Sequence, residues 1–258
     1  MCRHLAYVGP SVPLGRLLTE PEHSLVRQAW APRRQRHGTI NADGFGVGWY
    51  APGDPVPARY RRAGPVWGDL TFADLARVVR SGAVLAAVRD ATEPGADGEA
   101  AAGPFADGPW LFSHNGVLRD WPDAVAGPGG PAGGLPPQAL LQLAARTDSA
   151  LVWALVLHRL RAGAELGAAL AEAVRGVSAA APGSRLNLLL TDGVGIAATA
   201  WGDSLWYLAE PEGPGGGRTV VASEPHDDDP RWCEVPDRSL LTASRTRVAI
   251  TPLKENAP

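Results

Sequence analysis

Strand-forming segments occupy both ends of this chain, and helix-forming sequence fills its middle. Residues 2–9 alternate apolar and polar side chains up to Gly9-Pro10, as a half-buried strand does. Ala- and Leu-rich sequence occupies 138–179, after which strand patterns return. This order is typical of paired antiparallel sheets with helices packed outside them. The expected strands are 2–9, 43–50, 57–62, 84–88, 110–113, 185–191, 194–201, 204–209, 218–223 and 247–251.

Helices are expected in three places. Apolar residues at helical spacing predict one helix over 14–30, broken or restarted at Pro21, and a short helix over 71–80. The segment 138–179 predicts two or three helices, interrupted near 146–149 and at Gly163.

The domain organisation follows from chain length and from one irregular segment. Gly and Pro dominate 127–137, which predicts a mobile loop rather than a domain boundary. A chain of 258 residues can bury one sizeable core. We therefore expect a single domain over 2–251 and a C-terminal tail over 252–258.

Charge and cysteine usage exclude several classes of protein. The formal net charge is only −3, which does not point to nucleic acid or to an anionic membrane. No stretch of the sequence reaches the length of about 18 apolar residues that a spanning helix needs, and the first residues do not resemble a secretory signal. Cys2 and Cys233 are the two cysteines, so a disulfide scaffold is excluded and a cytoplasmic location is expected.

Cys2 directly follows Met1 and is a candidate nucleophile. A thiolate attacks carbonyl carbon well, but a thiol is mostly protonated at neutral pH and needs a base. Removal of Met1 would make Cys2 the terminal residue, and its own α-amino group, with a reference pKa of about 7.7–8.0, would supply that base. The alternative is a small apolar residue that fills a gap in the core.

Asn115 and Gly116 follow Ser113 and His114 at the end of an expected strand. An acyl-transfer site needs hydrogen-bond donors where the oxyanion forms. An Asn amide and a Gly backbone N–H can supply them together, because Gly allows close approach. The alternative is a hairpin turn, for which Asn-Gly is a strong signal.

Arg89 and Asp148 are candidates for binding a zwitterion. Arg89 follows the expected strand 84–88, and its planar guanidinium matches a carboxylate in two-point contact. Asp148 stands at an expected helix start, where its carboxylate would accept a substrate ammonium group. The alternatives are a surface ion pair for Arg89 and a helix cap for Asp148.

Taken in chain order, Cys2, Arg89, Asn115-Gly116 and Asp148 resemble the active-site set of the class II glutamine amidotransferases, in the N-terminal nucleophile hydrolase superfamily. The resemblance implies that Cys2 attacks a γ-amide carbon. It implies an oxyanion hole made by Asn115 and Gly116. It further implies that Arg89 holds the substrate α-carboxylate and that Asp148 holds its α-amino group.

The same resemblance implies the architecture and one more contact. The expected fold is α+β, a four-layer αββα sandwich with two stacked, mainly antiparallel sheets and helices outside. Thr92 falls where the family places a substrate-contacting Thr, and the chemistry implies neither a cofactor nor a metal. Glu93-Pro94 follow Thr92 where glutamine-using members usually have His-Gly, which favours a substrate other than free glutamine.

Four segments narrow the resemblance to the amidohydrolases of ergothioneine biosynthesis: APRRQ at 31–35, NADG at 41–44, VWGD at 66–69 and ASEP at 222–225. This implies hydrolysis of the γ-glutamyl amide of a small molecule, γ-glutamyl-hercynylcysteine sulfoxide. Alternatives are a glutamine amidotransferase, a glutathione-directed amidohydrolase, and a binding module with the same fold. That substrate carries a trimethylammonium group, so we expect Trp67 or another Trp to line the pocket.

Two charged clusters and the second cysteine are assigned no catalytic role. The acidic residues Glu224 and 227–229 suggest a divalent metal, but a solvated loop is the favoured interpretation. The basic residues within 33–37 suggest phosphate or nucleic acid, which the surrounding composition does not support. Cys233 is expected to be inert.

Overall fold

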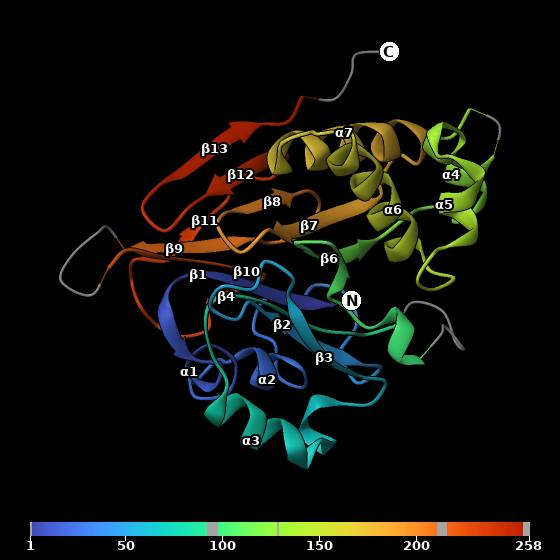
Figure 1. Cartoon of the computed structure of the whole chain (residues 1–258). Coiled ribbons are helices and arrows are strands. Elements are labelled where there is room, and N and C mark those ends of the chain that lie inside the picture. Colours follow the sequence, from blue (N-terminus) through green and yellow to red (C-terminus); the bar gives the residue numbers. More distant parts are fainter. Residues whose placement is uncertain (1, 92–97, 128, 211–215, 255–258) are drawn as a thin grey trace.

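The structure is a computed structural model that describes residues 2–91, 98–127, 129–210 and 216–254. Its strands form two stacked sheets, and every strand pair within those residues is antiparallel (Figure 1). The seven-stranded sheet contains, in spatial order, β11 (Cys233–Glu234), β9 (Trp206–Glu210), β10 (Arg218–Ala222), β1 (Arg3–Pro13), β4 (Arg80–Val88), β2 (Phe45–Trp49) and β3 (Ala58–Arg62). The six-stranded sheet contains β13 (Val248–Pro252), β12 (Ser239–Ala243), β8 (Ile196–Ala200), β7 (Arg185–Thr191), β6 (Trp110–Val117) and β5 (Phe105–Asp107).

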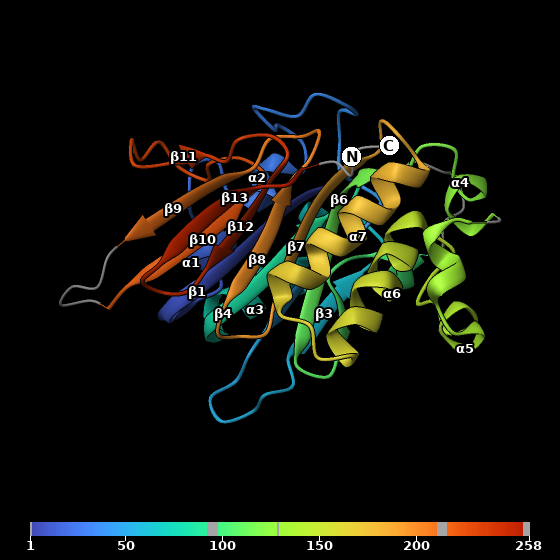
Figure 2. The same cartoon turned by 90° about the horizontal axis from the view of Figure 1, so that it is seen from above.

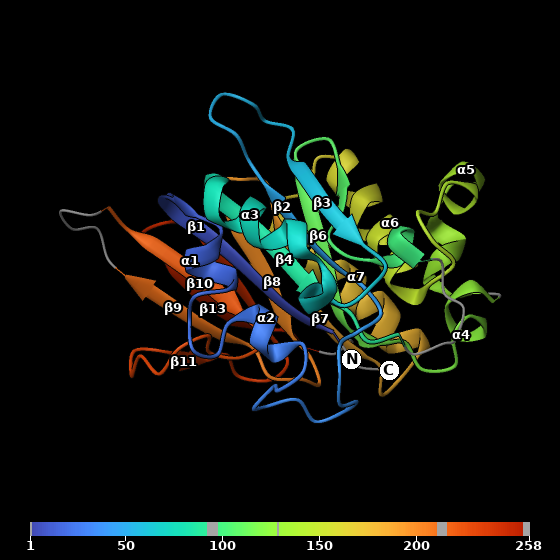
Figure 3. The ribbon, with the colours of Figure 1, turned by 90° about the horizontal axis from the view of Figure 1, so that it is seen from below.

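Helices cover the outer face of each sheet. Figures 1 and 3 show α1, α2 and α3 on the face of the seven-stranded sheet that is turned away from the six-stranded sheet. Figure 2 shows α6 and α7 side by side over the six-stranded sheet. The predicted four-layer αββα sandwich is therefore confirmed. Among the described helices, none is both long and apolar enough to cross a membrane. The helices are α1 (Gly15–Leu18), α2 (Leu25–Gln28), η1 (Val66–Gly68), α3 (Leu70–Val78), η2 (Gly98–Ala101), α4 (Asp123–Ala126), η3 (Pro131–Gly134), α5 (Pro137–Leu141), α6 (Asp148–Arg161) and α7 (Leu166–Ala180).

Apolar clusters fill the spaces between the layers, and β7 shows how the sequence produces them. Leu186, Leu188 and Leu190 pack with the residues of α6 and α7, whereas Leu189 packs into the space between the two sheets. Successive side chains of a strand point to opposite faces, so a strand covered on both faces needs an almost continuous apolar run. A third cluster joins the seven-stranded sheet to α1, α2 and α3.

The sequence located most elements but misjudged several of their ends. β1 continues past Gly9-Pro10 to Pro13, with an irregular register between Val8 and Val12. The helix expected over 14–30 is two single-turn helices on either side of Pro21, as the expected break allows.

Three further differences lie in the second half of the fold. The strand expected over 110–113 extends through Val117, so Asn115-Gly116 do not form a turn. The expected loop 127–137 contains η3 and the first residue of α5, and residue 128 lies outside the described residues. β12 was not expected from the sequence.

The acidic and basic clusters bind each other. The two carboxylate oxygens of Glu224 accept the backbone N–H groups of Arg33 (3.0 Å) and Arg34 (2.7 Å). Arg33 also pairs with Asp228 at 2.9 Å, and the guanidinium of Arg34 lies 4.5 Å from the ring centroid of Trp206. The solvated-loop interpretation is wrong for Glu224, which is fully buried and anchors the segment 31–35.

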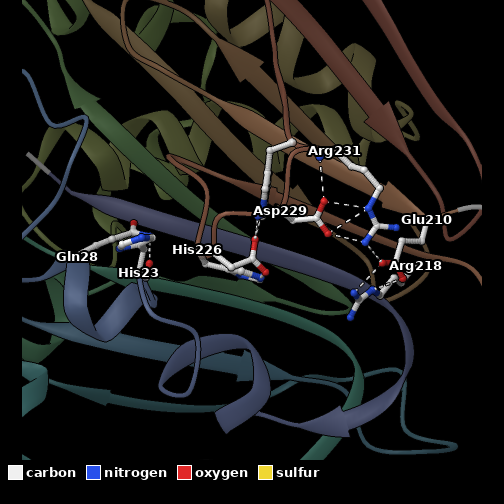
Figure 4. Close-up of polar contacts among 9 residues, drawn as sticks. His23, Gln28, Glu210, Arg218, His226, Asp229 and Arg231 are labelled. Atoms are coloured by element: carbon white, nitrogen blue, oxygen red, sulfur yellow. Dashed lines mark hydrogen bonds and ion pairs between the residues drawn. The ribbon is translucent and has the colours of Figure 1, made fainter.

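The rest of this loop is tied to the neighbouring hairpin. Figure 4 shows Arg231 between Asp229 and Glu210, with Glu210 also paired to Arg218. Arg231 donates to Asp229 Oδ1 from Nε at 2.9 Å and to Glu210 Oε1 from Nη2 at 2.8 Å, and Arg218 Nε lies 2.6 Å from Glu210 Oε2. These pairs join the loop after β10 to the strands β9 and β10.

His4, in β1, makes the fold sensitive to acid. Its ring is fully buried, and burial, aided by the charges of His114 and Arg3, lowers its pKa from 6.5 to about 3. Below about pH 6.5 the His4 imidazole is protonated in the unfolded chain but stays neutral in the folded chain. The free energy of unfolding therefore falls as the pH falls from 6.5 to about 3. We expect His4 to contribute a slope of about 1.4 kcal/mol per pH unit in this window.

Urea unfolding at several pH values measures this slope, and His4→Gln removes its source. The variant should show a shallower loss of stability between pH 6 and pH 4 than the parent. Parallel curves for the two proteins would show that His4 is not the responsible group.

Candidate active site

One cleft of about 440 Å³ brings together residues that are distant in the sequence. Cys2, Arg89, Gly116 and Asp148 all line it. The described lining residues are Cys2, Arg89, Asp90, Ala91, Ala101, Gly116, Val117, Leu118, Arg119, Asp120, Trp121, Thr147, Asp148, Ser149 and Arg185. Thr92 and Glu93-Pro94 lie outside the described residues.

The pairing of β1 with β4 places Cys2 beside Arg89. Arg3 is opposite Val88 in this antiparallel pair, so the next residues outward, Cys2 and Arg89, follow at the same end of the sheet. Two hydrogen bonds hold the backbone of Arg89 in place. Its N–H donates to Gly44 O at 2.8 Å, and its carbonyl oxygen accepts from Asp43 N at 2.9 Å.

Cys2 is half-buried and free of any disulfide. Burial raises the pKa of its thiol, while the positive charge of the chain terminus, a hydrogen bond with the Asp90 backbone and the charge of Arg89 oppose the rise. A thiol with a raised pKa is a weak nucleophile unless a base is close. Because Cys2 lines the cleft, it does not fill a gap in the core.

The alternation of β6 sends its polar side chains to two different layers. Ser113 Oγ lies 3.2 Å from His4 Nδ1, and Asn115 Nδ2 lies 3.4 Å from Ser223 Oγ, so both side chains face the seven-stranded sheet. His114 faces the other way and meets Ser149 of α6. Asn115 is fully buried and lies behind the cleft rather than on its described surface.

A glycine is required at position 116 because the backbone of Arg185 in β7 lies close to it. A Cβ at this position would lie 1.9 Å from the carbonyl oxygen of Arg185 and 2.6 Å from His114 Nε2. The backbone of β7 cannot move aside without breaking the β6–β7 pairing, and the imidazole is held by its contacts with Ser149 Oγ and Arg185 O.

Gly116→Ala is therefore expected to lower the free energy of unfolding by about 3 kcal/mol or more. The matched control is Gly133→Ala in η3, where a Cβ would meet nothing within 4 Å and stability should change by less than about 0.5 kcal/mol. Urea unfolding of both variants measures the difference, and equal stabilities would contradict the predicted clash.

Asp148 is the first residue of α6, but it does not cap the helix. Thr147 is the cap, and its side chain accepts the N–H of Ala150 at 3.2 Å. The Asp148 carboxylate instead accepts the N–H of Leu118 at Oδ2 (3.0 Å) and the N–H of Ser149 at Oδ1 (2.7 Å). The capping alternative is wrong, and the carboxylate is left oriented at the cleft wall.

Several cleft residues were not found from the sequence. Trp121 lines the cleft, so an aromatic ring is present as expected, but Trp67 is not in the described lining and packs edge-on against Trp30 at 5.6 Å. Arg119 and Asp120 come from the same segment after β6. No motif marks them, because only the path of the chain after β6 brings them to the cleft.

Arg185 is the remaining cation that the sequence did not reveal. It starts β7, and its Nε lies 3.5 Å from Oδ2 of the buried Asp203. Burial lowers the pKa of Arg185 and raises that of Asp203, and the mutual attraction of the two charges opposes both shifts. The buried carboxylate of Asp203 thus orients the guanidinium of Arg185 at the cleft.

The sequence profile of the class II glutamine amidotransferases matches residues 19–222. The chain belongs to this family. The γ-glutamyl-hercynylcysteine sulfoxide hydrolase of Mycolicibacterium smegmatis is 41% identical over 254 residues, covering 98% of this chain and all of that protein. The protein of the same name from Mycobacterium tuberculosis is 40% identical over the same length, covering 98% and 97%.

Solved structures of amidotransferases share the fold. A class II glutamine amidotransferase domain protein from Silicibacter pomeroyi superposes with a TM-score of 0.63 at 25% identity, covering 98% of this chain and all of that one. The glutamine phosphoribosylpyrophosphate amidotransferase of Bacillus subtilis has a TM-score of 0.61 at 15% identity, covering 99% of this chain and 50% of its own. The second likeness concerns the fold alone.

Proposed function

We propose that this amidotransferase-family enzyme hydrolyses the γ-glutamyl amide of γ-glutamyl-hercynylcysteine sulfoxide, releasing glutamate and hercynylcysteine sulfoxide, as a step of ergothioneine biosynthesis. The observation that carries the proposal is the 41% identity to a hydrolase of that name over 98% of this chain and all of that protein. The cleft supports it, because a thiol, a guanidinium and a carboxylate line the same space. These are the groups that cleavage of a γ-glutamyl amide needs.

The nucleophile in this proposal is Cys2 after removal of Met1. Its α-amine takes the thiol proton, and the thiolate attacks the γ-carbonyl carbon of the glutamyl group. The tetrahedral intermediate collapses as the amine leaves with that proton, which forms a thioester on Cys2. Water then attacks the thioester, assisted by the same α-amine, and glutamate is released.

The oxyanion donors are assigned to Gly116 and Asn115. The Gly116 backbone lies at the cleft, where its N–H is proposed to donate to the oxyanion. The Asn115 amide has two N–H groups, and its nitrogen makes one long contact of 3.4 Å to Ser223. Such a weakly bound amide can turn toward a developing negative charge, where a donor is most effective.

The glutamyl group is held by charge at its α-carbon. Arg89 binds the α-carboxylate with its guanidinium, and Asp148 binds the α-ammonium group. Thr92 is proposed as a further contact to this end of the substrate. Two opposite charges at fixed positions select a zwitterion over either singly charged analogue.

The leaving group carries a fixed cation, and Trp121 with Asp120 is proposed to receive it. Aromatic faces attract quaternary ammonium groups, and a carboxylate nearby adds charge. A cytoplasmic location is also proposed, because a nucleophilic thiol stays reduced there.

Assay of the purified protein with three compounds tests the proposed substrate. Released glutamate is measured with the hercynyl conjugate, with glutathione and with glutamine. We expect kcat/KM to be at least about 100-fold higher for the hercynyl conjugate, since about 3 kcal/mol of added contact to the leaving group gives this factor. Preference for glutamine or glutathione would replace the proposal with the amidotransferase or glutathione-directed alternative.

A further inference from the structure

Hydrogen bonds around His114 determine where the hydroxyl proton of Ser149 points. His114 Nε2 lies 3.0 Å from the carbonyl oxygen of Arg185, and a carbonyl only accepts, so Nε2 carries a hydrogen. In a neutral imidazole the other nitrogen, Nδ1, then has no hydrogen and accepts. Ser149 Oγ lies 2.9 Å from Nδ1, so Ser149 donates its proton to His114.

Asp148 lies on the other side of this hydroxyl. Its Oδ1 is 3.3 Å from Ser149 Oγ, so the same hydroxyl could also donate to it, but the 2.9 Å contact with His114 Nδ1 is shorter and takes the proton. Because the hydroxyl proton is directed at His114, Ser149 Oγ and Asp148 Oδ1 face each other as two acceptors. Both residues line the cleft, whereas His114 is buried behind them. Two adjacent acceptors call for a group with several N–H donors, and a primary ammonium carries three.

We propose that Ser149 is a second acceptor for the α-ammonium group of the substrate, with its hydroxyl oriented by His114. This rests on the proposed function, in which Asp148 binds the same ammonium. Ser149 is then a binding residue and His114 a positioning residue.

The local structure favours this role over a purely structural one. Capping of α6 is already provided by Thr147, so the Ser149 hydroxyl is not needed for it. The positive end of the α6 dipole opposes the binding of a cation at this position. With Asp148 as its only acceptor, the ammonium group would be bound against the repulsion of the helix dipole. A second oxygen acceptor from Ser149 adds attraction that offsets this repulsion.

The test compares Ser149→Ala with Ser149→Thr, which keeps the hydroxyl. The readouts are kcat and KM for the γ-glutamyl substrate and the inhibition constant of its glutaryl analogue, which lacks the α-amino group. Ser149→Ala should raise KM about 10-fold with little change in kcat, because a hydrogen bond to a charged group is lost from substrate and transition state alike. Ser149→Thr should stay within about threefold of the parent, and neither variant should change the inhibition constant of the glutaryl analogue.

Two more variants separate positioning from folding. His114→Gln should raise KM for the γ-glutamyl substrate and leave the glutaryl inhibition constant unchanged, since it removes the imidazole that orients Ser149. The substitution also removes the contact of this imidazole with Arg185 O, and urea unfolding measures the structural cost separately. Ser178→Ala on α7 is the matched control, because its hydroxyl bonds Arg175 O outside the cleft, and it should leave KM unchanged.

Three outcomes would overturn the inference. Equal losses for the γ-glutamyl and glutaryl compounds in Ser149→Ala would mean a structural role, and parent-like KM in an active Ser149→Ala would mean no contact. A parent protein that hydrolyses no γ-glutamyl compound would instead refute the proposed function, and the inference with it.

Discussion

Cys2→Ala is expected to lower kcat/KM for the γ-glutamyl substrate on the order of 10⁴-fold or more. The variant keeps the cleft and the terminal amine, but it has no thiol to form the thioester. Water would have to attack the amide directly, without covalent catalysis. Glutamate release under single-turnover conditions, with enzyme in excess, measures this loss and detects any residual rate.

Cys233→Ala is the matched control for this prediction. Cys233 is exposed on β11, and its thiol contacts the carbonyl oxygen of Arg231 at 3.5 Å, away from the cleft. Activity within about twofold of the parent is expected. Cys2→Ala with the activity of the parent protein would refute Cys2 as the nucleophile.

The terminal amine is tested separately from the thiol. Burial raises the pKa of the Cys2 thiol, so the proposed mechanism depends on a base beside it. Inserting a Lys between Met1 and Cys2 keeps the thiol but moves the free amine to another residue, and activity should fall by at least about 100-fold. Intact-mass measurement on the parent protein should show loss of Met1, and full activity with Met1 retained would contradict the role of the amine.

The sequence was most informative where a polar residue stands at the end of a patterned segment. Cys2 precedes β1, Arg89 follows β4 and Asp148 begins α6, and strand or helix periodicity locates each of these ends. The structure brings all three to one cleft. The local sequence pattern was sufficient for these three residues because each lies at the end of a strand or helix, and periodicity shows where a strand or helix ends.

Asn115-Gly116 show where local pattern fails. The pair predicts a turn, but β6 continues through it because Gly116 pairs with Leu186 of β7, a contact distant in the sequence. Tertiary pairing overrides the local turn preference, and a single sequence does not reveal which strand will be the neighbour. Arg185 was missed for the same reason, and which Trp would line the cleft was not found, since both depend on how distant strands and their connections pack.

Asp148→Asn is expected to lower kcat/KM about 10²- to 10³-fold, because removing one partner of a hydrogen-bonded charge pair costs about 2–5 kcal/mol. Asparagine has nearly the same shape and can still accept the N–H of Leu118, so the start of α6 should keep its structure. The loss therefore reports on the negative charge rather than on folding. If the substrate ammonium is held equally in the ground state and the transition state, the effect appears in KM and kcat changes little.

Asp123→Asn provides the matched carboxylate control. Asp123 is an exposed residue of α4 that is not in the cleft lining, so the same chemical change there should leave KM unaltered. The glutaryl analogue supplies the second control, because it brings no ammonium group to Asp148 and should bind the variant at least as well as the parent. A large loss of affinity for the glutaryl analogue would mean that Asp148 shapes the cleft instead of binding the ammonium. Unchanged KM for the γ-glutamyl substrate would remove Asp148 from the site altogether, and the charge that orients the glutamyl group would then come from Arg89.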